Sequence, residues 1–269
     1  MPSLAIISST QDRASMNIRK QLFNLHPFEK AANAFEGHPI LKTDIGPYQA
    51  GLYTIKRKNI FAENLDELNK DLIIFLSKHA AKSGIPSLSA HTTGNWGTAE
   101  FGGKDSALST SPANLLKAFI NNLMKNEQEF DVIQEVTHHG PYCKTPSLFI
   151  ELGSTENEWS QPRPAKALAE TLIQTLINPI KEHPSAIAFG GPHNMPNFKK
   201  TIRGDEYAIG HTCAKYQLPD INDQMIQQAI EATLPTPEIA LLDWKGLGQE
   251  KQRLLDALEA ANLDYKRLK

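Results

Sequence analysis

The chain has 269 residues, of which 40% are hydrophobic and 22% are charged, and its formal net charge at pH 7 is −2. No global field therefore draws it to DNA or to an anionic membrane, although a local basic patch would still allow RNA binding. Two cysteines give no disulfide framework, and no stretch reaches the roughly 18 uncharged apolar residues of a membrane helix. We expect a soluble cytoplasmic protein with no signal peptide, no DNA partner and no membrane contact, and a monomer by default.

Strand-like and helical patterns alternate along the chain. Apolar runs typical of strands covered on both faces are separated by segments with apolar residues at helical spacing. In chain order, we expect a strand at 4–8, a helix at 13–25, a strand at 72–76, a helix at 111–125, strands at 132–136 and 148–152, a helix at 163–177, a strand at 186–189, a weaker strand at 207–209, a short helix at 223–231, a strand at 239–242 and a helix at 250–261. This alternation predicts an α/β fold, a three-layer sandwich with a mixed, mostly parallel sheet, in a single domain over residues 1–269.

Local signals refine two segments. Ser111 stands where a helix cap is expected, with Pro112 at the first helical position. The stretch 30–64 contains several glycines and a Tyr-Thr-Ile-Lys-Arg-Lys run instead of a helical pattern. It predicts either a β-hairpin excursion or an edge of the main sheet.

Five of the nine histidines stand in turn-rich clusters that follow strand-like runs: His91, His138, His139, His193 and His211. Open α/β sheets place their chemistry in loops at strand ends. These histidines therefore predict a polar pocket built from loops on one edge of a sheet. The other four precede proline or lie near helix ends, so we interpret them as structural. These are His26, His38, His79 and His183.

The segment 91–97, His-Thr-Thr-Gly-Asn-Trp-Gly, combines turn-forming glycines with polar side chains. We interpret His91 as a general base or a metal ligand and Asn95 as a second catalytic group. Substrate-binding candidates in the same loop are Thr92, Thr93, Gly94 and Trp96. The alternative is a polar turn with a hydrogen-bonded histidine, and the tryptophan could equally pack in the core.

Two further clusters place histidine or glutamate in or after apolar runs. His138 and His139 precede Gly140-Pro141. Neighbours on a strand point to opposite faces. We therefore expect one of the pair in the site and the other to be structural, unless the strand end bends. Glu151 lies inside an apolar run, where a buried carboxylate needs a partner such as a histidine or a metal. Pairing with lysine or with a loop amide is the alternative.

A glycine turn precedes His193. Gly190 and Gly191 end a strand-like run, and backbone N–H groups in such a turn can bind an anion. Lys199 and Lys200 follow and could contact phosphate, although a solvated basic surface is the commoner outcome.

His211 stands two residues before Cys213. The two side chains could bind one zinc or form a nucleophile and base, although a buried inert thiol is more frequent. The sequence contains no Gly-x-Ser-x-Gly, His-Glu-x-x-His, Walker or Gly-x-Gly-x-x-Gly motif. A hydrolase of the common serine type is therefore disfavoured.

Five motifs in fixed order resemble those of the archaeal and plant D-aminoacyl-tRNA deacylases, the second type of this activity. They are His-Thr-Thr-Gly-Asn-Trp-Gly, Thr-His-His-Gly-Pro, Phe-Ile-Glu-Leu-Gly-Ser-Thr-Glu-Asn-Glu-Trp, Gly-Gly-Pro-His and Gly-His. The resemblance covers most of the chain. It implies hydrolysis of the ester that joins a D-amino acid to the 3′ end of tRNA, a phosphorylase/hydrolase-like fold akin to bacterial peptidyl-tRNA hydrolase, and zinc dependence.

Such a reaction needs activated water, stabilisation of an oxyanion and capture of the terminal adenosine. The catalytic candidates are His91, Asn95, His138, His139, Glu151, His193 and His211, and the candidate ligands for the implied zinc are His91, His138, His193 and His211. Two alternatives stay open. One is a zinc amidohydrolase or nucleoside-phosphorylase-like enzyme on a small substrate, and the other is a non-catalytic protein that binds RNA ends.

Overall fold

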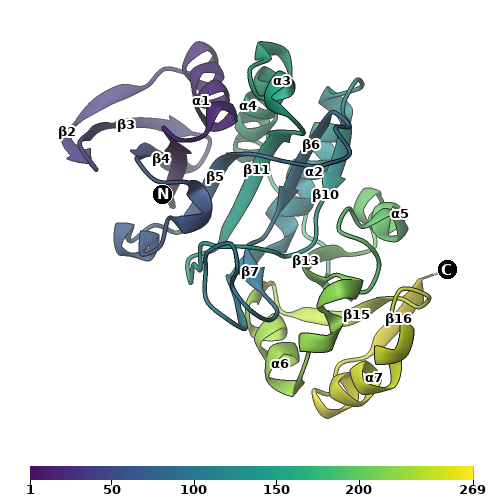
Figure 1. The fold of residues 1–269 in the computed structure, drawn as a ribbon. Coiled ribbons are helices and arrows are strands. Elements are labelled where there is room, and N and C mark those ends of the chain that lie inside the picture. Colours follow the sequence, from purple (N-terminus) through teal and green to yellow (C-terminus); the bar gives the residue numbers. More distant parts are fainter. Residues whose placement is uncertain (269) are drawn as a thin grey trace.

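The computed structural model describes residues 1–268, which form two main β-sheets with helices around them (Figure 1). The larger sheet has eight strands, in the spatial order β10 (Asp131–Gln134), β6 (Ser87–His91), β11 (Ser147–Gly153), β5 (Leu72–Lys78), β1 (Ser3–Ser9), β4 (Tyr48–Ile55), β3 (His38–Ile45) and β2 (Glu29–Phe35). The smaller sheet has four, in the order β13 (Ala208–Cys213), β12 (Ser185–Phe189), β15 (Pro237–Asp243) and β16 (Tyr265–Leu268). Two short ladders pair β7 (Gly94–Asn95) with β8 (Ala107–Leu108) and β9 (Ser111–Pro112) with β14 (Thr233–Leu234).

The helices lie between the strands in sequence. The α-helices are α1 (Arg13–Leu25), α2 (Ala113–Asn126), α3 (Glu156–Trp159), α4 (Pro162–Ile177), α5 (Lys199–Arg203), α6 (Asp223–Glu231) and α7 (Lys251–Ala260). The 3-10 helices are η1 (Asn59–Phe61), η2 (Leu65–Leu68), η3 (Pro196–Phe198), η4 (Lys215–Asp220) and η5 (Gly248–Glu250). The expected start of α2 is wrong. Ser111 and Pro112 form a strand that pairs with β14, and the Ser111 hydroxyl bonds Thr92 and does not cap the helix.

The main sheet is mixed and mostly parallel, so the predicted α/β fold is confirmed. β1 pairs in parallel with β4 and β5, and β5 pairs in parallel with β11. β6 runs antiparallel to β11. The stretch 30–64 contributes the antiparallel strands β2, β3 and β4, and β4 joins them to β1. The hairpin excursion is therefore also an edge of the main sheet.

The strands of the main sheet are buried on both faces because successive side chains alternate between two hydrophobic clusters. Ile6 and Ile74 belong to the cluster that the sheet forms with α1, α2 and α4. Ile7 and Phe75 belong to a second cluster, completed by residues of η2 and the loops around it. α-Helices thus cover one face of the sheet, whereas 3-10 helices and loops cover the other.

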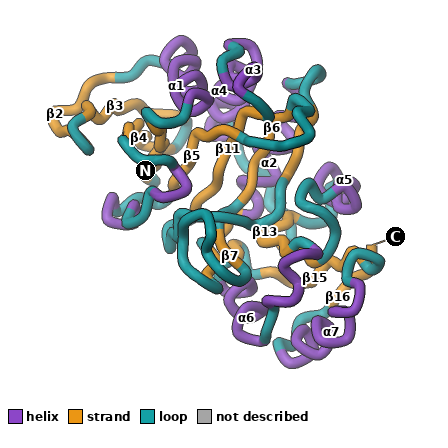
Figure 2. The backbone as a smooth tube through the Cα atoms, in the orientation of Figure 1, coloured by secondary structure: helices purple, strands orange, loops and turns teal. Residues whose placement is uncertain are grey.

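The smaller sheet packs on the same helix layer. α2 contacts β13, and one hydrophobic cluster contains residues of both sheets, including Ile150 and Ala188. The backbone also links them, since the Thr137 N–H donates to the Thr212 carbonyl at 3.0 Å. Long loops gather where the sheets meet (Figure 2). The single domain stays a prediction, and this shared core favours it. Within residues 1–268, no helix is long and apolar enough to cross a membrane.

Candidate active site

The polar residues gather on the loop-covered face of the main sheet. Glu151 on β11 and His91 at the end of β6 share this face with Phe149, and the His91 ring stacks on the Phe149 ring with 5.4 Å between centroids. Because β6 runs antiparallel to β11, the carboxyl ends of these two strands lie at opposite edges of the sheet. The prediction of a pocket at one edge is therefore wrong, and the site lies over the face.

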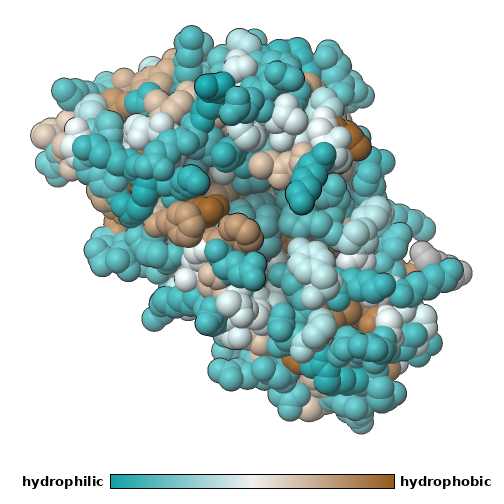
Figure 3. Space-filling model, viewed as in Figure 1, coloured by the Kyte–Doolittle hydropathy of each residue, from teal (hydrophilic) through white to brown (hydrophobic). Residues whose placement is uncertain are grey.

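A pocket of about 700 Å³ opens above this face. Its ionisable lining residues include His79, Glu135, His138, His139, Glu151 and His193. The space-filling view shows a largely hydrophilic surface with a group of hydrophobic residues near the centre of the molecule (Figure 3). The pocket is therefore rich in titratable groups, as expected of an active site.

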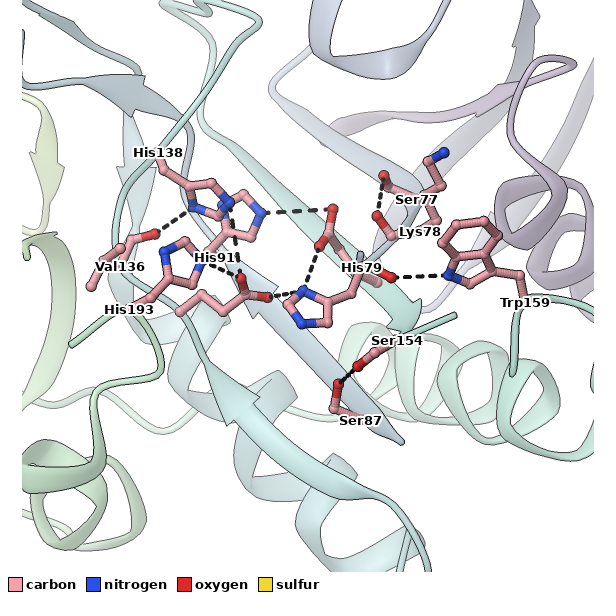
Figure 4. A network of polar contacts seen from close by, with 12 residues as sticks. Ser77, Lys78, His79, Ser87, His91, Val136, His138, Ser154, Trp159 and His193 are labelled. Atoms are coloured by element: carbon pink, nitrogen blue, oxygen red, sulfur yellow. Dashed lines mark hydrogen bonds and ion pairs between the residues drawn. The ribbon is translucent and has the colours of Figure 1, made fainter. Parts of the chain in front are cut away.

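A chain of ion pairs crosses the pocket (Figure 4). The Nδ1 atom of His79 lies between two carboxylates, 3.1 Å from Oε1 of Glu135 and 3.7 Å from Oε2 of Glu151. Glu135 also accepts a hydrogen bond from Nε2 of His193 at 2.7 Å. Oε1 of Glu151 lies 3.8 Å from Nε2 of His91. Both carboxylates are buried, so these histidines are their nearest polar partners.

The ion pairs decide which groups carry charge. Burial lowers the pKa of His79, but hydrogen bonds with Glu135 and Glu151 outweigh burial and raise this pKa to about 10. Burial raises the pKa of Glu151, but the nearby rings of His79 and His91 outweigh burial and lower this pKa to about 2. In the same way, hydrogen bonds with His193 and His79 hold the pKa of Glu135 well below its ordinary value. His79 is therefore protonated at neutral pH, between two ionised carboxylates.

Three histidine rings pack together beside this network. The centroids of His91 and His138 are 4.1 Å apart, and those of His138 and His139 are 4.3 Å apart. Each ring donates its Nδ1–H to a backbone carbonyl, at 3.1, 2.8 and 2.6 Å for Thr92, Val136 and Gly140 respectively. Burial and the neighbouring imidazoles lower the pKa of His138 well below its usual range and that of His139 to about 4. These last two rings are therefore neutral at neutral pH.

Adjacent His138 and His139 both line the pocket. The sequence prediction placed one of them outside the site unless the strand end bends. β10 ends at Gln134, four residues before the pair, and His139 has a φ of +46°. Because the two residues lie in a bend and not on a strand, both rings reach the same pocket.

His193 enters the pocket from the turn after β12. Its Nδ1 lies 3.0 Å from Oη of Tyr216, a residue of η4 whose ring is exposed and lines the same pocket. His193 also lines a second cavity of about 400 Å³ together with Lys199. Lys200 is exposed and belongs to the lining of neither.

Thr92, Thr93 and Gly94 lie beneath the pocket lining and do not face the cavity. The hydroxyls of Thr92 and Thr93 are buried, and each bonds a serine hydroxyl at 2.8 Å. The N–H of Gly94 donates to the carbonyl of His139 at 2.9 Å. These three residues lie outside the pocket lining, where they hold the backbone next to the histidines.

Asn95 and Trp96 do line the pocket. The side-chain amide of Asn95 donates to the carbonyl of Gly102 at 2.9 Å, so it holds the loop that follows. Trp96 is fully buried and donates its Nε1–H to the carbonyl of Thr212 at 3.1 Å. The structure therefore places Trp96 as a wall of the pocket that packs on the smaller sheet.

Four further predicted site residues lie outside the pocket lining: the fully buried His91, which packs behind His138, and Gly190, Gly191 and His211. His211 is fully buried, its Nδ1 is 3.0 Å from Oγ1 of Thr137, and burial lowers its pKa to about 4. It belongs to none of the groups of possible metal ligands found among residues 1–268. The N–H of Gly190 donates to the carbonyl of Cys213 at 2.9 Å, so the chain itself occupies that donor.

Sequence reasoning missed His79 and Glu135. His79 directly follows β5, and this is the strand-end position that singled out the other histidines. Glu135 lies in the apolar run 132–136, so the argument made for Glu151 applied to it as well. His79, which we interpreted as structural from the sequence, lines the pocket and contacts both of its carboxylates.

Comparison with known proteins gives the family. A family profile described as D-aminoacyl-tRNA deacylase matches residues 66–266, which is most of the chain. The chain belongs to this family. A D-aminoacyl-tRNA deacylase of Thermococcus onnurineus (strain NA1) is 34% identical over 275 residues, covering 97% of this chain and 98% of the relative. One of Pyrococcus abyssi (strain GE5 / Orsay) is 34% identical over 263 residues, covering 94% and 95%.

A solved structure supports the fold of this deacylase. The crystal structure of a conserved protein of unknown function superposes with a TM-score of 0.89 at 27% sequence identity, covering 99% of this chain and 95% of the other. The family and the fold class inferred from the order of the motifs are thus confirmed.

Proposed function

We propose that this deacylase hydrolyses the ester bond of D-aminoacyl-tRNA and releases free D-amino acid and tRNA. The chain is a family member, and one feature of its pocket carries the proposal. There, the ionised Glu135 carboxylate is hydrogen-bonded to His193, and neutral imidazoles lie next to His193. Those groups supply the proton acceptor and the charge that ester hydrolysis requires. No observation favours the small-substrate enzymes or the RNA-end-binding protein. Charged tRNA is a cytoplasmic substrate, which supports the expected location, and a monomer stays the expected state.

His193 is our candidate for the general base, and Glu135 orients its ring. The hydrogen bond of 2.7 Å to Glu135 places the proton of neutral His193 on Nε2, which leaves the lone pair on Nδ1. Nδ1 faces the Tyr216 hydroxyl at 3.0 Å. A water that takes the place of that hydroxyl, or that hydrogen-bonds to it, can pass its proton to Nδ1 as it attacks the ester carbonyl. The imidazolium then returns the proton to the leaving ribose oxygen.

His79 provides positive charge near the reacting carbonyl. Its pKa of about 10 keeps it protonated at neutral pH, and it lines the pocket. A fixed cation in a site that excludes bulk water stabilises the developing oxyanion. Glu151 holds this cation in place from the sheet, because β11 fixes its backbone next to β5.

Zinc is the proposed cofactor, and the residues present fit it. His91, His138 and His139 each offer a ring nitrogen within 4.8 Å of the other two. Their Nδ1–H groups are bonded to backbone carbonyls, as is common for metal-binding histidines, and the buried Nε2 of His91 lacks a hydrogen-bond partner among residues 1–268. These three residues would hold the ion, which would act as a Lewis acid. Of the four ligands expected from the sequence, His91 and His138 belong to this group.

The decisive test measures the preference for the D-enantiomer of the substrate and the contribution of His193 to kcat. We expect the purified protein to release D-tyrosine from D-tyrosyl-tRNA faster than L-tyrosine from L-tyrosyl-tRNA, and His193→Ala to lower kcat by about 100-fold or more. The matched control is His26→Ala, since His26 bonds the carbonyl of Asp44 far from the pocket lining. Equal rates on both enantiomers, or full activity in His193→Ala, would contradict the proposal.

The zinc proposal is tested by measuring how much zinc the purified protein contains and how zinc affects its stability. Mass spectrometry of the purified protein is expected to find zinc in the wild type and in His26→Ala, and much less in His139→Ala. Zinc should also raise the melting temperature of the metal-free wild type, because a ligand that binds the folded state stabilises it. A protein that binds no zinc when the ion is supplied would refute the cofactor proposal while leaving the role of His193 intact.

A further inference from the structure

A large aromatic side chain stands exposed at the pocket. Phe101 is 62% exposed, the highest value among the exposed aromatic residues of the described chain, and it lines the pocket together with the histidines. A phenyl ring left in water forgoes the free energy that burial of its apolar surface would supply. Single exposed apolar residues are common on protein surfaces, but Phe101 stands out because it lines the pocket that holds the histidines.

The backbone around Phe101 is held in place by three polar contacts. The carbonyl of Phe101 accepts from the N–H of Gly140 at 3.0 Å, one residue after His139. The next carbonyl accepts from the Asn95 amide at 2.9 Å, and the following N–H donates to Oε1 of Glu63 at 3.0 Å. These contacts hold the backbone that carries the exposed ring close to the histidines.

The tryptophans do not offer such a surface to the pocket. Trp96 lines it but is fully buried, with its indole N–H bonded to Thr212. Trp159 and Trp244 lie outside the pocket lining and carry Lys78 and Arg267 over their rings. Tyr216 also lines the pocket with an exposed ring, but its hydroxyl is bonded to His193 at 3.0 Å. Phe101 has no polar side-chain atom to satisfy, so both its chemistry and its exposure suit the flat face of a base.

The substrate supplies such a group close to the reacting bond. The ester lies on the ribose of the terminal adenosine, and the adenine is attached to that same ribose. A carbonyl placed at His193 therefore brings the base to the wall of the pocket. Lys58 and Lys78 also line the pocket and can meet the phosphates on the 5′ side of this adenosine, whereas the buried carboxylates cannot.

We propose that Phe101 is the platform on which the terminal adenine of tRNA stacks, and that it thereby sets the position of the ester over the histidines. This inference rests on the proposed function, since it takes the aminoacylated tRNA end as the substrate. Base–aromatic stacking contributes enough per base to affect binding of the RNA end strongly.

The test is a binding experiment that needs no turnover. Two uncharged RNA minihelices are compared, one ending in CCA and one with the terminal base replaced by an abasic ribose. We expect the wild type to bind the CCA minihelix about 5- to 150-fold more tightly than the abasic one. Phe101→Leu should remove most of this difference and leave the abasic affinity unchanged, whereas Phe101→Tyr should keep it. The control Tyr265→Leu alters an exposed aromatic residue outside the pocket lining, on β16 of the smaller sheet, and should behave as wild type.

The outcomes separate this inference from the proposed function. A wild type that does not discriminate between the minihelices, or a Phe101→Leu variant that still does, overturns the role of Phe101 whatever the deacylation assay shows. Discrimination that depends on Phe101 in a protein without deacylase activity would refute the proposed function and retain the stacking site. Equal melting temperatures of wild type and Phe101→Leu show that the loss does not come from misfolding.

Discussion

Glu135 is the residue on which the site depends most, because it bonds His193 and His79 while itself buried. We predict that Glu135→Gln lowers kcat for D-aminoacyl-tRNA by about 10²-fold or more, since the amide no longer stabilises either imidazolium. Single-turnover deacylation measures the effect. The control is Glu129→Gln, which removes an exposed carboxylate at the other end of β10. Wild-type kcat in Glu135→Gln would exclude Glu135 from the catalytic machinery.

The raised pKa of His79 makes a pH-dependent contribution to stability. The folded protein binds this proton more tightly than the unfolded chain, so the stabilisation is complete below about pH 6.5 and is lost as pH rises toward about 10. We predict that the difference in unfolding free energy between wild type and His79→Gln, measured by urea titration with a chelator present, shrinks steadily from pH 6.5 to 9.5. A difference that stays constant over this range would show that His79 does not carry the shifted proton.

Among the structural elements, β7 and the loop after it bring Asn95 and Phe101 to the pocket. A Cβ at Gly102 would lie 1.9 Å from the carbonyl oxygen of Ile60, and Gly102 has a φ of +77°. Gly248 also has a positive φ, but nothing lies within 4 Å of its Cβ position. Replacing each glycine by alanine therefore imposes the same kind of backbone strain, but only the change at Gly102 adds a steric clash.

We predict that Gly102→Ala lowers the unfolding free energy by about 1–3 kcal/mol more than Gly248→Ala, because the first adds a steric clash to the strain that both share. Urea denaturation provides the comparison. Gly102→Ala should also weaken binding of the CCA minihelix, since the clash displaces the loop that carries Phe101. Equal losses in the two variants would mean that the loop accommodates the methyl group.

For the whole molecule, Trp96 connects the pocket to the smaller sheet. Its indole N–H donates to Thr212 on β13, and its ring contacts Phe189 on β12. We predict that Trp96→Phe lowers the unfolding free energy by about 1–3 kcal/mol through the lost buried hydrogen bond and the smaller ring. Trp244→Phe, at a partly exposed ring, should cost less than half of that. Similar losses would indicate that Trp96 does not tie the sheet to the pocket.

The sequence by itself determined the elements and the family. Apolar runs and helical spacing are local properties, so the strands at 72–76 and 148–152 and the helix at 163–177 follow from neighbouring residues alone. The motifs around His91, His138 and His193 keep a fixed order, which is why they predicted the deacylase family that the comparisons show.

Only the tertiary structure decided which of these residues meet. The contact of Glu135 with His79 joins positions 56 residues apart, and it depends on β10, β6, β11 and β5 standing in that order in the sheet. The direction of β6 moved the site from the edge of the sheet to its face, and the bend after β10 brought both His138 and His139 into the pocket while His211 stayed in the core. Strand order and direction come from long-range packing, which no local sequence pattern encodes.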